Sequence, residues 1–253
     1  MAADDYLKGI LLRESVDTRA ESPVRAVQGQ LMPALNHWAG EYLRSVSPSG
    51  SFAKGTANKS GTDIDLFISL HSHTPGTLNN IYDTLAQKMT AIGLAPRKQN
   101  VSISVRVGNV DVDLVPARRQ DNVGEDHSLY KRRGDTWMKT NVATRVALVR
   151  NGGRTAETRI LKLWRNQKGL DFLSFYLELT TIEALRGKGP GTLSANVWTV
   201  FSYLRDNILS ARVVDPANTN NVISDDLAVD EKRAIKRAVE AALAAKDWGE
   251  IVR

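Results

Sequence analysis

The sequence contains no cysteine. This absence excludes disulfide scaffolds, zinc sites with thiolate ligands, iron–sulfur clusters and cysteine nucleophiles. The sequence also has no run that approaches the roughly 20 apolar residues of a membrane-spanning helix. Residues 1–5 are acidic, whereas a signal peptide begins with basic and then apolar residues. We therefore expect a soluble, cytoplasmic protein that makes no contact with a membrane.

The composition is that of a folded protein. Of the 253 residues, 42% are hydrophobic and 25% are charged, which is ordinary for a globular chain and excludes global disorder. A chain of this length is expected to form one large domain or two closely packed lobes.

The net charge of +6 is concentrated in the middle of the chain. Residues 97–168 contain 16 Lys or Arg against 7 Asp or Glu, whereas the rest of the chain has 18 against 21. Concentrated positive charge is what a polyanion-binding surface needs, although a short run such as Lys131-Arg132-Arg133 is ordinarily a solvated surface feature. The segment 97–168 is therefore predicted to face nucleotide phosphates or to bind a nucleic-acid or protein activator.

Two helices are predicted in the first half of the chain. Apolar side chains recur at helical spacing over residues 22–46, where Pro33 would kink or restart the helix. The second helix covers residues 77–92 and is stopped by Gly93.

Strands are predicted where apolar and polar side chains alternate. Residues 64–70 form one strand. Residues 101–107 and 110–114 alternate in the same way on either side of Gly108-Asn109, so they form a hairpin that ends at Pro116.

The pattern changes after Pro116. Residues 119–137 are polar and are predicted to be irregular. Five helices are predicted after them, over residues 142–150, 155–167, 172–186, 193–210 and 230–247. Strands followed by helices predict an α+β fold.

The most informative segment runs from Gly50 to Asp65. At Gly50-Ser51, the glycine allows close backbone approach and the hydroxyl beside it can bind a phosphate oxygen. Asp63 and Asp65 stand two residues apart at the start of a strand, so both carboxylates project to one face. Adjacent carboxylates repel each other unless a cation lies between them, and oxygen ligands suit Mg²⁺, which also bridges substrate phosphates.

A second Asp-x-Asp pair, Asp111 and Asp113, lies on the return strand of the hairpin. If the hairpin lies beside the strand 64–70, a third carboxylate joins the first two, and three carboxylates can hold two divalent ions. One ion lowers the pKa of an attacking hydroxyl, and the other neutralises a triphosphate and its leaving pyrophosphate. A single Asp-x-Asp is ordinarily a solvated edge or a turn, but two pairs together with a Gly-Ser loop favour a metal site.

The motifs resemble those of the polymerase-β-type nucleotidyltransferase superfamily. The matching residues are Gly50-Ser51, Gly55-Thr56, Asp63-x-Asp65 and Asp113-Leu114-Val115-Pro116. Further segments narrow the resemblance: Leu161-Lys162-Leu163-Trp164, residues 173–179, Asp215-Pro216, and His127-x-x-Tyr130 with Gly134-x-x-Trp137. Together they are similar to bacterial cyclic-oligonucleotide synthases, which are related to cyclic GMP-AMP synthase and 2′-5′-oligoadenylate synthetase. The resemblance covers about residues 47–227.

The resemblance implies a role for each matching residue. The metal ligands and catalytic residues would be Asp63, Asp65 and Asp113, of which Asp113 would also activate the attacking hydroxyl. The triphosphate contacts would be Gly50, Ser51, Lys162 and Ser174. From the residues alone, Lys162 could equally extend to solvent. Asp111 matches no position of the family motif. The cofactor would be two Mg²⁺ ions, with Mn²⁺ as an alternative.

The resemblance also implies a fold of two lobes. A nucleotidyltransferase lobe, residues 1–120, would hold a mixed β-sheet flanked by helices. It would pack against a mainly helical lobe, residues 121–253, with the active-site cleft between the two lobes.

The predicted function is an Mg²⁺-dependent nucleotidyltransferase. It would join NTPs into a short linear or cyclic oligonucleotide second messenger, release pyrophosphate, and act as a monomer in bacterial antiphage signalling. The alternatives are a tRNA- or RNA-tailing enzyme, a protein-modifying nucleotidyltransferase toxin and a catalytically silent nucleotide-binding module. Only about 25 residues follow Leu227, which argues against a tRNA-binding tail, and the complete carboxylate triad argues against a silent module.

Overall fold

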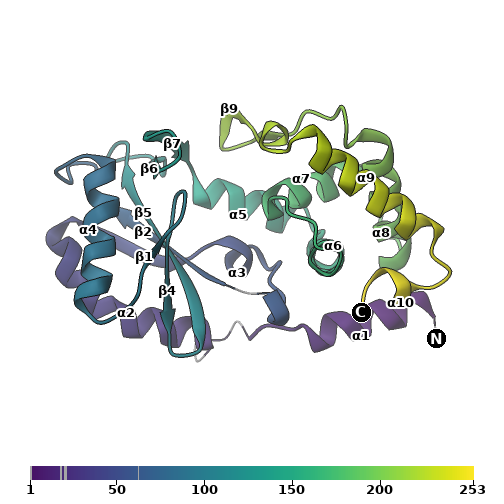
Figure 1. Cartoon of the computed structure of the whole chain (residues 1–253), viewed down its shortest axis with the longest axis horizontal. Helices are drawn as coiled ribbons and strands as arrows, with labels where there is room; N and C mark the ends of the chain where they lie inside the picture. The colour runs from purple at the N-terminus through teal and green to yellow at the C-terminus, as the bar shows by residue number, and fades with distance from the viewer. Residues whose placement is uncertain (1, 18, 20–21, 62) are drawn as a thin grey trace. The chain divides into compact units, whose positions relative to one another are not determined.

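The computed structural model describes residues 2–17, 19, 22–61 and 63–253. These residues form helices and a mixed β-sheet, so the predicted α+β class is confirmed. The chain divides into two compact units, and most of their helices and strands are labelled in Figure 1. The sheet unit comprises Asp17–Lys54 and Gly61–Val146, and the helical unit comprises Met1–Val16, Gly55–Ser60 and Ala147–Arg253.

The bounds of these units differ from those of the predicted lobes, residues 1–120 and 121–253. Beyond residue 120, β6 (His127–Lys131) pairs with the preceding strand and extends the sheet. At the other end of the chain, α1 (Ala3–Arg13) belongs with the helices, because its Leu7 and Ile10 are buried in the core of the helical unit. The helical unit is therefore built from segments that are distant in sequence.

The sheet has seven strands in the described residues. They are β1 (Leu43–Pro48), β2 (Ile64–Leu70), β3 (Arg97–Lys98), β4 (Ile103–Val107), β5 (Val110–Arg119), β6 and β7 (Thr136–Thr140). Their order is β1-β2-β5-β4-β3, and β6 pairs with both β5 and β7. β5 is parallel to β2 and antiparallel to β4 and β6.

The predicted strand over residues 64–70 and the predicted hairpin are both confirmed. Val107 pairs with Val110 across the two-residue turn, where Gly108 has a φ of 59°. β5 does not end at Pro116 as predicted but continues to Arg119. It continues because residues 117–119 pair with β6, and residues 117 and 118 also pair with β2.

Two long helices belong to the sheet unit, α2 (Pro23–Ala39) and α4 (Leu78–Ala91), and both contact its strands. Each helix begins at a hydroxyl that accepts a hydrogen bond from a backbone N–H of the first turn. Ser22 Oγ accepts from Arg25 N at 3.4 Å, and Thr77 Oγ1 accepts from Asn80 N at 3.1 Å. The short α3 (Gly50–Lys54) follows β1, and α5 (Val142–Asn151) follows β7.

The helix predicted over residues 22–46 is too long. α2 contains Pro33 but ends at Ala39, because Gly40 has a φ of 54°, which a right-handed helix does not allow. A 3₁₀ turn over Gly40–Tyr42 leads into β1, whose Val46 pairs with Ile68 of β2. Pairing with the sheet therefore overrides the helical spacing of the apolar residues in this segment.

The prediction that residues 119–137 are irregular is also wrong. They contain β6 and the start of β7, which pair around a turn where Asp135 has a φ of 46°. The hairpin forms because Leu129 of β6 is buried against Phe67 and Ala117 in a small apolar cluster. Phe67 alternates with Leu66 and Ile68 along β2, so this cluster lies on the other face of the sheet from those two residues.

The helical unit is built mainly of helices. They are α1, most of α5, α6 (Thr155–Gln167), α7 (Ser174–Ala184), α8 (Leu193–Asn207), α9 (Val229–Ala244) and α10 (Trp248–Ile251), with a two-stranded ribbon of β8 (Val214–Asp215) and β9 (Asn218–Val222). Trp164 of α6 and Phe201 of α8 meet edge to face in its core, with ring centroids 5.0 Å apart. Among the helices that the structure describes, none is long and apolar enough to cross a membrane.

His127 forms a buried polar pair on the sheet. Its Nε2 lies 2.7 Å from Ser69 Oγ, and its Nδ1 lies 2.9 Å from the Glu125 carbonyl oxygen. Because a carbonyl can only accept, Nδ1 carries a proton, and in the neutral imidazole Nε2 then accepts from the Ser69 hydroxyl. Burial lowers the pKa of the imidazole below its ordinary value. Burial therefore favours the neutral form of His127 over the protonated form.

The free energy of unfolding should decrease as the pH falls below about 6.5, the ordinary histidine pKa. There the unfolded chain binds a proton at this position that the folded chain does not bind. We expect the urea midpoint of the wild type to fall more between pH 7.5 and 5.5 than that of His127→Gln, measured by circular dichroism. Equal decreases in both proteins would contradict the assignment.

Candidate active site

The Gly50-Ser51 segment lies against the start of β2. Gly50 is the first residue of α3 and has a φ of 53°. A Cβ added at this position would lie 1.7 Å from Asp65 Oδ2. The preceding residue is tied to the same strand, because Ser49 N donates to the Asp65 carbonyl oxygen at 2.8 Å. Only a glycine fits here, since any side chain would displace the Asp65 carboxylate.

The pairing of β2 with β5 brings two of the predicted carboxylates together. Asp65 and Asp113 are direct partners in the parallel register, and both are half-buried. Asp63 is exposed, two residues before Asp65, and by the strand period it projects to the same face. Burial raises the pKa of the Asp113 carboxyl, and the negative charge of Asp63 also raises it. The three carboxylates therefore belong to one edge of the sheet, where the charge of Asp63 acts on Asp113.

Asp113 has polar partners that the sequence motifs did not reveal. Gln99 Nε2 donates to its Oδ1 at 3.2 Å, and Ser102 Oγ donates to its Oδ2 at 3.3 Å. Hydrogen bonds from Ser104 and Ser102, and the positive charge of Arg97, partly offset the rise in the pKa of Asp113. The position of Ser104 could have been predicted from the two-residue turn of the hairpin. This turn sets the register of β4 against β5, which places Ser104 opposite Asp113.

Asp111 has a different environment from Asp113. It pairs across the hairpin with Arg106, and the two side chains form an ion pair at 3.8 Å. Both side chains are more than a third exposed to solvent. Asp111 is therefore a solvated residue, in line with the absence of a matching family position.

The oxygen donors at this edge fit a hard divalent cation in type. Gly50 has no side chain, and the space that this leaves is occupied by the Asp65 carboxylate. A metal site at this position needs that space. In the part of the chain that the structure describes, however, no three carboxylates or imidazoles are placed as ligands of one ion. In the described structure, the two oxygens of Asp113 accept hydrogen bonds from Gln99 and Ser102.

Lys162 and Ser174 belong to the helical unit, where both side chains contact other groups of that unit. Lys162 is buried, and its Nζ donates to the Thr56 carbonyl oxygen at 3.0 Å. Thr56 Oγ1 in turn donates to Glu178 Oε1 at 2.7 Å. Ser174 Oγ accepts from Arg165 Nη1 at 3.0 Å. The role of Lys162 and Ser174 as triphosphate contacts stays a prediction.

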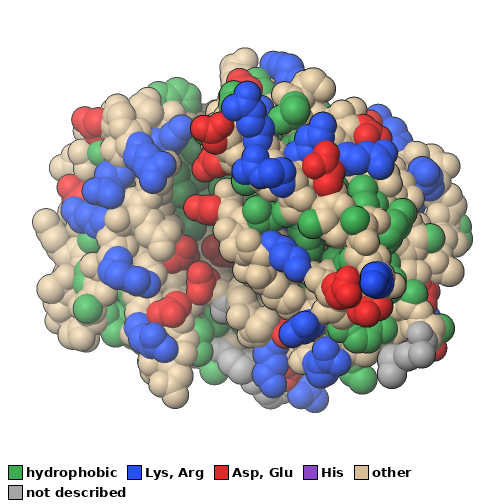
Figure 2. Space-filling view, turned by 45° about the vertical axis from the view of Figure 1, so that its right-hand side comes forward, with side chains coloured by type: hydrophobic (Ala, Val, Ile, Leu, Met, Phe, Trp, Pro, Cys, Tyr) green, Lys and Arg blue, Asp and Glu red, His purple; other side chains and the backbone are tan. Residues whose placement is uncertain are grey.

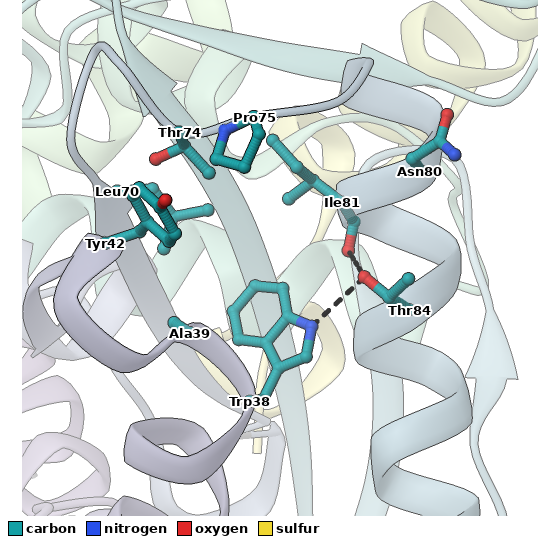
Figure 3. Close-up of a pocket in the computed structure, with 9 residues that line it drawn as sticks. All are labelled: Trp38, Ala39, Tyr42, Leu70, Thr74, Pro75, Asn80, Ile81 and Thr84. Atoms are coloured by element: carbon teal, nitrogen blue, oxygen red, sulfur yellow. Dashed lines mark hydrogen bonds between the residues drawn. The ribbon is translucent and has the colours of Figure 1, made fainter.

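A separate pocket of about 250 Å³ opens in the sheet unit between α2, α4 and the end of β2 (Figure 3). Its lining is mainly apolar and aromatic, and the Trp38 indole N–H is already satisfied by Thr84 Oγ1 at 3.1 Å. Leu70, at the opposite end of β2 from Asp65, forms part of the wall. The pocket therefore does not belong to the carboxylate site.

The positive charge of residues 97–168 is partly neutralised within the sheet unit. Lys98 pairs with Asp83 at 2.6 Å, and Lys139 pairs with Asp126 at 2.8 Å. On the face drawn in Figure 2, the Lys and Arg side chains are interspersed with acidic and apolar ones. Part of the excess of basic residues in this segment is thus engaged in ion pairs with acidic residues of the sheet unit.

Comparison with known proteins relates the chain to bacterial nucleotide synthases. No protein-family model matches it. The chain is 25% identical over 225 residues to the cyclic AMP-AMP-AMP synthase of Escherichia coli (strain MS 115-1), an alignment that covers 79% of this chain and 70% of that protein.

Solved structures show the same fold. Escherichia coli MS115-1 CdnC with ATP has a TM-score of 0.78 at 20% identity, covering 99% of this chain and 97% of that chain. The complex of Escherichia coli MS115-1 CdnC with HORMA-deltaN has a TM-score of 0.77 at 20% identity, covering 99% of this chain and 96% of that chain. The Bradyrhizobium diazoefficiens CD-NTase CdnG with GTP has a TM-score of 0.74 at 13% identity, covering 96% of this chain and 91% of that chain. The predicted nucleotidyltransferase fold and the predicted resemblance to bacterial cyclic-oligonucleotide synthases are confirmed.

The contact between Gly50 and Asp65 can be tested with Gly50→Ala. The new methyl group would displace the Asp65 carboxylate and would also strain a left-handed backbone, which costs about 1–2 kcal/mol. We expect nucleotide turnover to be lost and the free energy of unfolding to decrease by at least this amount, measured by urea denaturation.

Gly108→Ala is the matched control, because Gly108 has a φ of 59° and no atom lies within 4 Å of an added Cβ. The strain should lower the free energy of unfolding of Gly108→Ala, but its nucleotide turnover should equal that of the wild type. A Gly50→Ala variant as active as Gly108→Ala would contradict the role of Gly50.

Proposed function

We propose that the chain is a metal-dependent nucleotidyltransferase that joins NTPs into a short cyclic or linear oligonucleotide and releases pyrophosphate. The observation that carries this proposal is the edge of the sheet where Asp65 pairs with Asp113 and lies against Gly50. The similarity to a cyclic AMP-AMP-AMP synthase, and to structures determined with ATP and GTP, supports the same class of reaction. The sequence relative, the cyclic AMP-AMP-AMP synthase, does not favour the tRNA- or RNA-tailing or the toxin alternatives.

The cofactor in this proposal is a divalent cation, Mg²⁺ or Mn²⁺, held by Asp63, Asp65 and Asp113. When bound, such an ion stabilises the charge that develops on phosphate oxygens and lowers the pKa of a coordinated hydroxyl. Asp113 is also the proposed acceptor of the proton from the attacking hydroxyl.

The remaining predicted residues bind the triphosphate in this proposal. Ser51 offers a half-buried hydroxyl beside Gly50, whose backbone can approach a ligand closely because it has no side chain. Lys162 and Ser174 complete the predicted set. The product of the Escherichia coli relative contains adenine bases only, so ATP is the first substrate to test.

A protein partner is the proposed activator. The solved complex of CdnC with HORMA-deltaN shows that a protein of the same fold binds another protein. The basic segment 97–168 stays the predicted surface for such a partner or for a nucleic acid. Bacterial antiphage signalling is the biological setting that we propose for the product.

The carboxylate assignment predicts the effect of three substitutions. Asp63→Asn and Asp65→Asn should each lower NTP turnover by about 100-fold or more, because a metal ligand contributes several kcal/mol to transition-state stabilisation. Asp111→Asn should stay within a few-fold of the wild type, since Asp111 contacts Arg106 and not the site. Turnover is measured by incubating purified protein with the four NTPs and Mg²⁺ or Mn²⁺, followed by phosphatase treatment and mass spectrometry.

Two results would contradict this proposal in different ways. If folded Asp63→Asn and Asp65→Asn proteins keep full turnover, the site is wrong. If the wild type forms no phosphatase-resistant product, alone or with nucleic acid or a cell extract of infected bacteria, the function itself is wrong.

A further inference from the structure

A short turn beside the candidate site connects β3 to β4. It comprises residues 99–102 and is called the 99–102 turn. The turn is closed by a hydrogen bond from Gln99 N to the Ser102 carbonyl oxygen at 2.9 Å. Two of its side chains donate to Asp113, one to each carboxylate oxygen, at 3.2 and 3.3 Å. Ser102 Oγ also lies 3.2 Å from Gln99 Oε1. The two donors and the carboxylate therefore form one connected network.

The other side of the 99–102 turn is held by α4 and by the hairpin of β6 and β7. Tyr82 is buried in α4, and its hydroxyl lies 2.8 Å from the Gln99 carbonyl oxygen and 2.9 Å from that of Ser102. Burial raises the pKa of Tyr82 to about 12, so the hydroxyl keeps the proton that it donates. Arg132 Nε also donates to the Gln99 carbonyl oxygen, at 3.2 Å. The position of the turn is thus fixed independently of Asp113.

These hydrogen bonds leave Asp113 able to bind a cation. An ionised carboxylate has about four lone-pair positions. Gln99 and Ser102 donate to one oxygen each, and Ser104 donates a further hydrogen bond, so about one position remains for a cation. Donors in this position orient a ligating carboxylate and restrict its rotation, and their removal typically costs about 10–100-fold in metal affinity or activity.

We propose that Gln99 and Ser102 are positioning residues that orient the Asp113 carboxylate for a divalent cation. Tyr82 acts through them by holding the 99–102 turn against α4. This inference rests on the proposed function, in which Asp113 is a metal ligand. It adds three residues that no motif of the sequence assigns to the site.

The test measures binding of Mn²⁺ alone to the full chain, without nucleotide, by the loss of the electron paramagnetic resonance signal of free Mn²⁺. Gln99→Leu and Ser102→Val should raise the dissociation constant about 10–100-fold. Ser102→Thr carries the same added methyl group as Ser102→Val but keeps a hydroxyl, so it should restore most of the affinity. Tyr82→Phe should weaken binding by a smaller factor, although it does not touch Asp113.

Gln120→Leu is the matched control. Gln120 is an exposed glutamine of the same unit whose Nε2 donates to Ser128 Oγ at 3.2 Å, away from the carboxylates. This variant should bind Mn²⁺ as the wild type does. Urea denaturation of every variant separates a change at the site from a general loss of stability.

The outcomes distinguish this inference from the proposed function. If Asp113→Asn loses Mn²⁺ binding but Gln99→Leu and Ser102→Val keep it, the positioning role is overturned and the metal site stands. If Ser102→Thr binds as poorly as Ser102→Val, the Ser102 hydroxyl has no positioning role. If the wild type binds no Mn²⁺, the metal site and this inference both fail.

Discussion

The parallel pairing of β2 with β5 is the constraint on which the candidate site depends. It sets Asp65 directly beside Asp113, although 47 positions of sequence separate them. Parallel strands require a crossover connection, and α4 lies in the segment that connects these two strands. A slip of one residue in either strand would turn its aspartate to the other face of the sheet. The burial of Leu66 and Leu114, partners in the same register, therefore fixes the position of the carboxylates.

That pairing has an electrostatic cost. The negative charge of Asp63 raises the pKa of Asp113; as a general scale, two unit charges about 5 Å apart repel each other by about 3 kcal/mol at the effective dielectric constant that suits protein sites near the surface. A hydrogen bond to a charged group contributes about 1.5–3 kcal/mol. Gln99 and Ser102 each donate a hydrogen bond to Asp113. The free energy of these hydrogen bonds is thus comparable to the repulsion from a neighbouring carboxylate. The fold can hold the aspartates together before any cation binds, provided that these donors are in place.

Much of the sheet and one part of the site followed from local sequence patterns. The two-residue turn Gly108-Asn109 defines the hairpin register, so the position of Ser104 beside Asp113 was contained in the sequence. The strand at residues 43–48 was not, because its apolar residues continue the helical spacing of α2 and only pairing with β2 makes the segment extended. The hairpin of β6 and β7 was missed for a similar reason, since the cluster that stabilises it includes Phe67 from another strand.

The contacts of Gln99 and Tyr82 could not be predicted either. They depend on where a connecting turn packs against a helix that is distant in sequence, and no spacing rule describes such packing. The motifs identified the residues whose chemistry the reaction needs. They gave no information on the neutral side chains that hold those residues in place, because Gln, Ser and Tyr at a surface turn have many ordinary roles.

Lys162 shows why a matching motif does not settle the role of a residue. Residues 55–60 join the Gly-Ser loop to Asp63, and the helical unit holds them at several points. Lys162 Nζ donates to the Thr56 carbonyl oxygen, and Arg159 exchanges hydrogen bonds with Asn58 at 3.0 and 2.9 Å. Replacing Lys162 would remove an anchor of this segment as well as any contact with a phosphate. A loss of activity in such a variant therefore assigns Lys162 to the triphosphate only if the affinity for NTP falls while the free energy of unfolding is unchanged.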